Sequence, residues 1–257
     1  MLRNDRITFI RDYLQKNFSV KVGFLSKKLE VTPETIRRDL EYLEELGEVK
    51  RVHGGAILKK ANIIETNFLV REAINKKEKE LIAKEACQFV KEEDFIALDV
   101  STTNTEIAKQ LVQNFQKLYI LTNSLNIATI LSKNENFKIF LPSGELRNSE
   151  LCITGSTAVS FIHTFNIDTF FMSVSGISME KGLTDYALRE FEVKMAMYKN
   201  ANNVFAVADH TKFEKTAMFK IGELHSVNGI ITDPYIPEEI LEKYEANEVH
   251  IFYSQNN

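Results

Sequence analysis

Apolar residues recur every three to four positions in three successive stretches of the first 45 residues. The three stretches contain Ile7, Ile10 and Leu14; Val22, Leu25 and Leu29; and Ile36, Leu40 and Leu43. This spacing places the apolar side chains of each stretch on one face of a helix. The pattern therefore predicts three amphipathic helices that pack their apolar faces together.

The segment between the second and third helices has the signals of a tight turn. In "EVTP", Thr32 is a suitable N-cap, and Pro33 occupies the first helical position, where no N–H is needed. A tight turn here predicts a helix-turn-helix over about residues 20–39. Gly47 then ends the third helix as a left-handed cap. Because "EVKRV", "HGG" and "AIL" next predict a β-hairpin, we expect a winged helix-turn-helix domain over residues 1–58.

The polar face of the third helix and the hairpin carry the chemistry expected for DNA binding. Arg37 and Arg38 face outward in the first two turns, where a recognition helix meets base edges and a guanidinium group holds guanine or phosphate with two hydrogen bonds. In the alternative interpretation, both arginines form a solvated face paired with Glu34 and Glu41. The basic hairpin favours DNA binding, because its cations would follow the phosphate backbone. The predicted DNA-binding residues are Thr32, Glu34, Thr35, Arg37, Arg38, Lys50, Arg51, His53 and Gly54.

Compact apolar segments alternate with helical patterns in the rest of the chain. The strand-like segments are residues 95–100, 117–123, 137–142, 168–174, 203–209, 228–233 and 249–252. Such alternation predicts a mainly parallel sheet with helices on both faces and a ligand site at the carboxyl ends of the strands. The predicted chain is α/β, with the winged helix-turn-helix (1–58), a linker (59–77) and a Rossmann-like sensor domain (78–257).

Small polar residues follow four of the predicted strands. Ser101, Thr102, Thr103 and Asn104 lead from the first strand into a helix, whose start would offer free N–H groups and hydroxyls to a phosphate. In the alternative interpretation, Ser101 or Thr102 only caps that helix. The other three strand ends supply Asn123 and Ser124; Gly144 and Arg147; and Lys212. Together the four strand ends predict a site for a small polyhydroxylated anion.

Composition limits the function further. The chain has 257 residues, 44% of them hydrophobic, and no apolar run reaches the ~18 residues that span a membrane. The acidic residues near its N-terminus do not fit a signal peptide, so we expect a cytoplasmic protein. Two cysteines and five scattered histidines predict neither a disulfide framework nor a metal site. Because the chain contains no G-x-G-x-x-G or Walker loop, we expect no nucleotide cofactor.

Charge is distributed unequally along the chain. The net charge is -4, yet residues 1–60 carry 13 Lys and Arg against 9 Asp and Glu, a net +4. The remaining residues carry 19 against 27, a net -8. The basic part therefore suits DNA, and the acidic part needs a different partner. Because one winged helix reads only a few base pairs, we also expect a homo-oligomer, either a dimer or a tetramer.

The motifs "TIRRDL" and "RVHGGA", at this separation, resemble those of the DeoR-type bacterial transcriptional regulators. In the second half, "LDVSTT", "TNS", "LPSGELR", "GLT", "EVKMAM" and "ADHTKF" resemble, in the same order, the sensor domain of that family, a relative of ribose-5-phosphate isomerase. The resemblance covers roughly residues 3–233. It implies a regulator, usually a repressor of carbohydrate genes, that binds operator DNA and a phosphorylated sugar.

The resemblance also implies roles for individual residues of the second half. Ser101, Thr102 and Thr103 would hold the phosphate, and Lys212 would contact the rest of the sugar. Glu192 and Lys194 would join Lys212, unless they form a surface ion pair on a helix over residues 186–200. The complete predicted ligand-binding set is Asp99, Ser101, Thr102, Thr103, Asn104, Asn123, Ser124, Gly144, Arg147, Gly176, Glu192, Lys194 and Lys212.

One motif departs from the family pattern. Many members read G-A-D-G-I-D where this chain reads "SVSGIS", with serines at 173, 175 and 178. Aldose-ketose isomerisation needs a carboxylate that abstracts a proton beside the carbonyl, and serine does not do this unaided. Asp99, Asp185 and Glu192 remain as possible bases. A sugar-phosphate isomerase with a DNA-binding extension is therefore the alternative function, and a regulator without catalytic residues is the preferred one.

Overall fold

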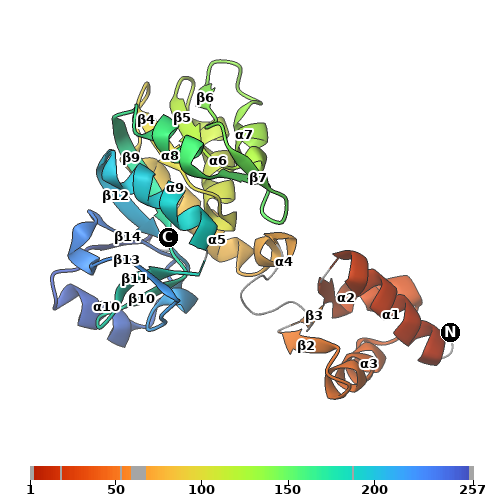
Figure 1. The fold of residues 1–257 in the computed structure, drawn as a ribbon. Coiled ribbons are helices and arrows are strands. Elements are labelled where there is room, and N and C mark those ends of the chain that lie inside the picture. The colour runs from red at the N-terminus through yellow and green to blue at the C-terminus, as the bar shows by residue number, and fades with distance from the viewer. Residues whose placement is uncertain (1–2, 18, 53, 59–67, 187, 255–257) are drawn as a thin grey trace. The chain divides into compact units, whose positions relative to one another are not determined.

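The computed structural model divides the chain into two compact units, Met1–Ile74 and Asn75–Asn257 (Figure 1). It describes residues 3–17, 19–52, 54–58, 68–186 and 188–254. Each unit has its own hydrophobic core. The mixed α/β architecture predicted from the sequence is confirmed.

The first unit contains a helical layer and a small sheet. Its elements are α1 (Arg3–Asn17), β1 (Ser19–Lys21), α2 (Val22–Leu29), α3 (Pro33–Glu45), β2 (Val49–Val52), β3 (Gly55–Leu58) and α4 (Phe68–Ala73). The strands form an antiparallel sheet in the order β1-β3-β2. All nine apolar residues of the three predicted stripes are buried in one core, which confirms the three helices.

Local chemistry explains where α3 begins and ends. The Thr32 hydroxyl accepts a hydrogen bond from the Thr35 N–H at 3.3 Å, and Pro33 occupies the first turn. Gly47 has a φ of +73°, and the next N–H, that of Glu48, donates back to the Leu43 carbonyl at 3.0 Å. Both predicted ends of the recognition helix are therefore confirmed.

A close approach of β1 to β3 requires glycine at position 55. A Cβ atom at Gly55 would lie 2.1 Å from the Val20 carbonyl oxygen. The adjacent Gly54 carbonyl accepts a hydrogen bond from the Val22 N–H at 2.8 Å. These contacts fix the hairpin to the start of α2.

The second unit contains a seven-stranded parallel sheet in the order β15-β14-β12-β9-β4-β5-β6. Its strands are β4 (Phe95–Leu98), β5 (Tyr119–Thr122), β6 (Lys138–Phe140), β9 (Ile167–Ser173), β12 (Ala201–Val207), β14 (Gly229–Ile231) and β15 (Ile251–Phe252). All seven predicted strands are present, and every pairing between them is parallel. Their carboxyl ends consequently lie along one edge of the sheet.

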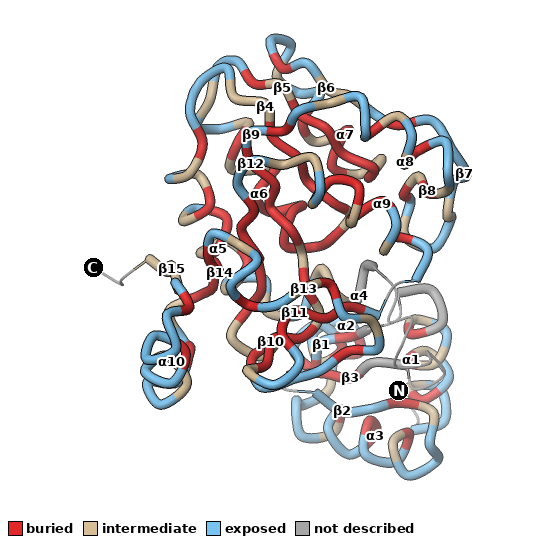
Figure 2. Tube along the Cα trace, turned by 60° about the vertical axis from the view of Figure 1, so that its left-hand side comes forward, coloured by how far each residue is buried: buried red, intermediate tan, exposed pale blue. Residues whose placement is uncertain are grey.

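Helices cover both faces of this sheet (Figure 1). On one face lie α5 (Lys76–Ala86), α6 (Thr102–Asn114) and α7 (Leu125–Leu131); on the other lie α8 (Ser156–Ile162), α9 (Leu188–Lys199) and α10 (Glu238–Glu245). Successive residues of each strand alternate between the two cores: Ala97 packs towards α8 and α9, and Leu98 packs towards α6. The central strands are accordingly buried along their length, whereas α10 exposes much of its surface (Figure 2).

Several short elements lie outside the predicted pattern. They are the hairpin β7 (Glu145–Arg147) and β8 (Cys152–Thr154), the sheet β10 (Gly176–Ser178), β11 (Gly182–Asp185) and β13 (Phe219–Gly222), and the 3-10 turns η2 (Cys87–Phe89), η3 (His210–Lys212) and η4 (Leu224–Ser226). The segment interpreted as a linker, residues 59–77, contains α4 and the first two residues of α5; its residues 59–67 lie outside the described residues. Within the described ranges, no helix has the length and apolar character needed to cross a membrane.

Candidate functional site

The outward face of α3 presents two adjacent arginines. The side chains of Arg37 and Arg38 are 59% and 77% exposed. Glu34 lies 3.0 Å from Arg37 and 3.9 Å from Arg38. Of the solvated ion pairs considered as the alternative, those with Glu34 are present, whereas Glu41 lies beside Arg51. Exposed pairs of this kind contribute little free energy. Both guanidinium groups remain accessible to a nucleic acid, and so do Thr32 and the half-buried Thr35.

The hairpin after α3 places a second set of cations on the surface. Lys50 and Arg51 lie on β2 and are exposed, and the turn residue Gly54 has a φ of +81°. The Arg51 guanidinium lies 2.8 Å from Glu44 and 3.4 Å from Glu41, so it fixes β2 to α3. His53, also predicted to bind DNA, lies outside the described residues.

One functional group of the first unit was not anticipated. Asp39 lies on α3 directly after the exposed Arg37 and Arg38, yet it is 1% exposed. Its carboxylate accepts hydrogen bonds from the Arg6 guanidinium at 2.7 and 3.2 Å, and Arg3 lies 3.6 Å away. The pair holds α1 against α3 and thereby orients the recognition helix.

In the second unit, the start of α6 has the free donors predicted for an anion site. Ser101 caps the helix by accepting the Asn104 N–H at 2.9 Å, as the capping interpretation expected. Thr102 and Thr103 follow at the first two helical positions, where their N–H groups have no intrahelical partner. Capping by Ser101 and anion binding by the two threonines are therefore compatible.

Other predicted ligand residues at this edge form hydrogen bonds within the protein. The Asn104 side-chain amide donates to the Asp99 carboxylate at 2.7 Å and to the Phe171 carbonyl at 2.9 Å. The Asn123 side chain accepts the Val100 N–H at 3.0 Å and donates to the Ile153 carbonyl at 3.2 Å. Ser124 caps α7 through the Ile127 N–H at 3.3 Å. Four residues of the predicted set are therefore fully or almost fully buried and shape the loops: Asp99, Asn104, Asn123 and Ser124.

A buried cation joins the ends of β9, β11 and the loop after β4. The Lys194 ammonium lies 3.1 Å from the Asp99 carboxylate, forms an ion pair with Asp185 and donates to the Ser173 carbonyl at 2.6 Å. Ser173 donates its hydroxyl to Asp99 at 2.6 Å, and Ser175 donates to Asp185 at 2.7 Å. Lys194 does not form the surface pair with Glu192 that was considered as an alternative, so that interpretation is wrong.

Burial and charge oppose each other in this cluster. Burial alone would lower the pKa of Lys194, but the two carboxylates hold it above its ordinary value. Burial also raises the pKa of Asp99, which Lys194 and Ser173 only partly offset. For Asp185, the nearby charge of Lys194 and three hydrogen bonds outweigh burial and lower the pKa. The ammonium is thus held charged between the two carboxylates, and both carboxylates form contacts within the cluster.

The β7–β8 hairpin is fastened to α9 through Arg147. Its guanidinium lies 2.5 Å from the Glu190 carboxylate, which the Cys152 thiol also contacts at 3.6 Å. Arg147 was predicted from the sequence to meet an anion, whereas Glu190 was not anticipated. Gly144 precedes the hairpin on the surface, and Gly176 lies buried in β10, where a Cβ would be 2.6 Å from the Lys215 carbonyl oxygen. Gly176 is therefore needed for packing.

The loop after β12 carries the predicted cation Lys212 at the end of η3. Lys212 is half-buried, and no partner for its ammonium is found among the described residues. The loop is held from two sides. Asp209 accepts the Asn75 amide at 3.1 Å, and the His210 ring lies 2.8 Å from the buried Asp233 carboxylate. Neither contact was anticipated, because the partners are far apart in the sequence.

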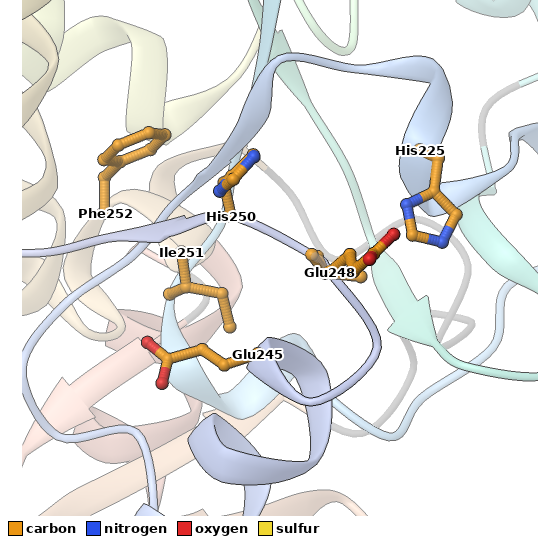
Figure 3. Close-up of a pocket in the computed structure, with 7 residues that line it drawn as sticks. His225, Glu245, Glu248, His250, Ile251 and Phe252 are labelled. Carbon is orange, nitrogen blue, oxygen red and sulfur yellow. The ribbon is translucent and has the colours of Figure 1, made fainter.

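Two surface depressions lie away from this edge. One, of about 640 Å³, is formed by the end of α10 and the residues before β15 and includes His225, Glu248 and His250 (Figure 3). The other, of about 440 Å³, lies between α8 and α9 and contains the exposed Glu192. The structure therefore does not bring Glu192 to the sheet edge. No three potential metal-ligating side chains gather within the described residues.

Comparison with known proteins identifies both halves of the chain. The family model of the DeoR C terminal sensor domain matches residues 74–234, and that of the DeoR-like helix-turn-helix domain matches residues 6–62. The chain belongs to the DeoR family. It is a DNA-binding transcriptional regulator, and the family resemblance found in the sequence is confirmed.

Relatives of this DeoR-family regulator match it over most of their length. The HTH-type transcriptional regulator GolR of Listeria innocua is 37% identical, over 90% of this chain and 91% of that protein. The glycerol-3-phosphate regulon repressor of Escherichia coli is 32% identical, over 94% of this chain and 95% of that protein. Among solved structures, ribose 5-phosphate isomerase A of Methanocaldococcus jannaschii aligns with 15% identity and a TM-score of 0.40. The alignment covers 54% of this chain and 55% of the isomerase chain.

Proposed function

We propose that this DeoR-family protein is a repressor whose affinity for operator DNA changes when a phosphorylated sugar binds to its second unit. The α3 helix enters the major groove and reads base edges, and the β2–β3 hairpin contacts the phosphate backbone. Because operator DNA lies in the bacterial cytoplasm, the protein acts there. Two winged helices in a homo-oligomer read two half-sites, which supplies the specificity that one lacks.

The exposed arginine pair of α3 carries the DNA-binding half of the proposal. Arg37 and Arg38 stand on the first turns of a helix whose opposite face is fully buried. Asp39 and Arg6 fix that helix, so the arginines are presented on a rigid element. Lys50 projects from the hairpin without an ion-pair partner among the described residues. Base contact and phosphate contact are thus assigned to different elements.

The sheet edge carries the effector half. Thr102 and Thr103 offer unpaired N–H groups and hydroxyls at the start of a 13-residue helix, which is favourable for a phosphate. Lys212 supplies a cation for the same anion or for the sugar. We assign no catalytic base, because Asp99 and Asp185 already neutralise Lys194. This arrangement supports binding of a sugar phosphate over its isomerisation.

Titration of operator DNA tests the first half. In fluorescence anisotropy, Arg37→Ala should weaken the binding free energy for operator DNA by about 1–3 kcal/mol and relax base preference, because it removes a base contact. Lys50→Ala should weaken binding to all sequences equally and reduce the salt slope by about 1. Lys91→Ala removes one exposed positive charge from the second unit and serves as the control. Unchanged affinity and salt slope in the first two variants would exclude this mode of binding.

A thermal-shift screen against a panel of sugar phosphates tests the second half. A ligand that binds only the folded protein raises the melting temperature, so one sugar phosphate should stabilise the wild type where its unphosphorylated sugar does not. Thr103→Val and Lys212→Met should remove that shift. Lys133→Met, which changes an exposed lysine elsewhere, should retain it. A shift that survives both site substitutions would place the ligand elsewhere.

A further inference from the structure

A groove between α8 and α9 has no function in the mechanism described above. It has a volume of about 440 Å³ and an apolar floor with a polar rim. Residues of the floor and the rim include Val159, His163, Phe191, Glu192, Met195 and Lys199. One helical turn towards the start of α9, Leu188 extends the apolar surface with 62% of its area exposed. This is an unusually exposed leucine beside an already apolar depression.

Two opposite charges stand on the rim without ion-pair partners among the described residues. Glu192 and Lys199 are both exposed on α9 and are seven residues apart. Seven residues make almost two complete helical turns, so the two side chains share one face but are separated by about 10 Å along the axis. They are too far apart to pair with each other, since a surface ion pair needs about 4 Å between charged atoms.

The positions of these charges are self-complementary. A two-fold axis that crosses α9 near Met195 would lay a second α9 antiparallel across the first. In that arrangement Glu192 of each copy meets Lys199 of the other, and both ion pairs form at once. Met195 lies between the two pairs, and Val159 and Phe191 line the same groove, so association would remove all three from water.

We propose that the α8–α9 groove is the surface through which two copies of this chain associate, with their α9 helices antiparallel. A second copy is favoured over an unrelated peptide because the charge pattern matches its own two-fold image. An apolar centre flanked by ionic contacts is the usual anatomy of such an interface. The proposal deepens the proposed function and rests on it, since it assigns the self-association that binding to two half-sites needs.

Charge reversal tests the interface with the full-length protein. Sedimentation velocity over a concentration series gives the dissociation constant of the wild type, Glu192→Lys, Lys199→Glu and the double variant. Each single reversal creates two like-charge contacts across the two-fold axis, so we expect the association to weaken at least tenfold. The double reversal restores both pairs and should return the constant to within about threefold of the wild type. Glu239→Lys, an exposed position on α10 with the same charge change, should have no effect.

Three results would overturn the proposal. The first is a monomeric wild type, and the second is single variants that associate as tightly as the wild type. The third is a double variant that associates as weakly as either single variant. Circular dichroism checks that each variant is folded, and the double variant is itself a control because it contains both substitutions. Neither DNA nor sugar is present in the measurement. Single or double variants that contradict the expectation therefore exclude only this interface and leave operator and sugar binding untouched. A monomeric wild type would also remove the homo-oligomer from the proposed function. A failure of operator or sugar binding leaves the interface result intact.

Discussion

Asp39 is a buried acid on α3 that directly follows the exposed Arg37 and Arg38. Its partner Arg6 lies 33 positions earlier, and the two side chains are 2% and 11% exposed. A charge removed from water is costly unless a partner compensates it, and here the guanidinium does so with two hydrogen bonds. The contact joins α1 to α3 in addition to the apolar core that they share.

Replacing Asp39 by Asn should destabilise the first unit by about 2–4 kcal/mol, because Arg6 would keep a poorly solvated charge without its counterion. Hydrogen exchange followed by mass spectrometry measures the effect locally, as faster exchange in peptides from α1 and α3. Glu45→Gln, at the exposed end of α3, is the matched control and should leave exchange unchanged. Equal exchange in both variants would show that the pair contributes no net stability.

The two thiols of the second unit should be unreactive in the native protein. Burial raises the pKa of Cys87 to about 11, and it raises the pKa of Cys152 as well. At pH 8 only about one Cys87 in a thousand is then a thiolate, the nucleophilic form. Alkylation by iodoacetamide should accelerate about tenfold for each pH step from 8 towards 11. A native rate at pH 8 equal to that of the urea-unfolded chain would contradict this expectation.

At the scale of elements, the apolar pattern predicted the three helices and the parallel strands and missed the short antiparallel strands. The three helices of the first unit have enough apolar positions to define a period. Each of the seven parallel strands lies within a compact apolar run of the sequence, although β6, β14 and β15 have only two or three residues each. By contrast, β1, β7, β8 and β10 have three residues each and lie in no such run. Their pairing depends on distant segments, such as Lys21 opposite Gly55. Short strands of this kind are specified by tertiary contacts and not by local sequence.

The candidate site was predictable in position but not in detail. The sequence shows that polar residues follow the strands, and the parallel sheet brings those strand ends to one edge. It does not show that Asn104 and Asn123 face inward, or that Arg147 is already paired with Glu190. These outcomes depend on which side chain reaches a partner 23 to 67 residues away in the sequence. Thr102, Thr103 and Lys212 are residues of that predicted set for which the described residues supply no acceptor.

Asn75 is the first residue of the second unit and adopts a left-handed conformation, with φ 51° and ψ 41°. Its side chain donates to Asp209 at 3.1 Å in the loop that carries Lys212. Asn75→Gly keeps this conformation accessible and loses only the side-chain hydrogen bonds, so the free energy of unfolding should fall by about 1–2 kcal/mol. Asn75→Ala should cost about 1 kcal/mol more, because alanine is strained there. Urea unfolding followed by circular dichroism ranks the two, and an alanine variant as stable as the glycine variant would argue against strain.

At the scale of the whole molecule, two units with separate cores must exchange information if a sugar controls DNA binding. Thermodynamic linkage makes such coupling reciprocal. If the effector changes operator affinity by a factor in the range of about 5–150, operator DNA must change effector affinity by the same factor. Isothermal titration calorimetry measures the affinity for the effector with and without operator DNA. Fluorescence anisotropy measures the affinity for operator DNA with and without the effector. Effector binding that is indifferent to saturating operator would contradict control through this site.

The strand order of the parallel sheet also has a consequence in time. Ile96 of β4 pairs with Thr169 of β9, so the centre of the sheet joins residues 73 positions apart. Ribosomes add about 5–20 residues per second, so this part of β9 is synthesised roughly 4–15 s after its partner in β4. Among the residues whose side chains the structure describes, the buried core of the winged helix ends at Ala56. The nascent chain can therefore complete its DNA-binding unit seconds before it possesses a sensor to control it.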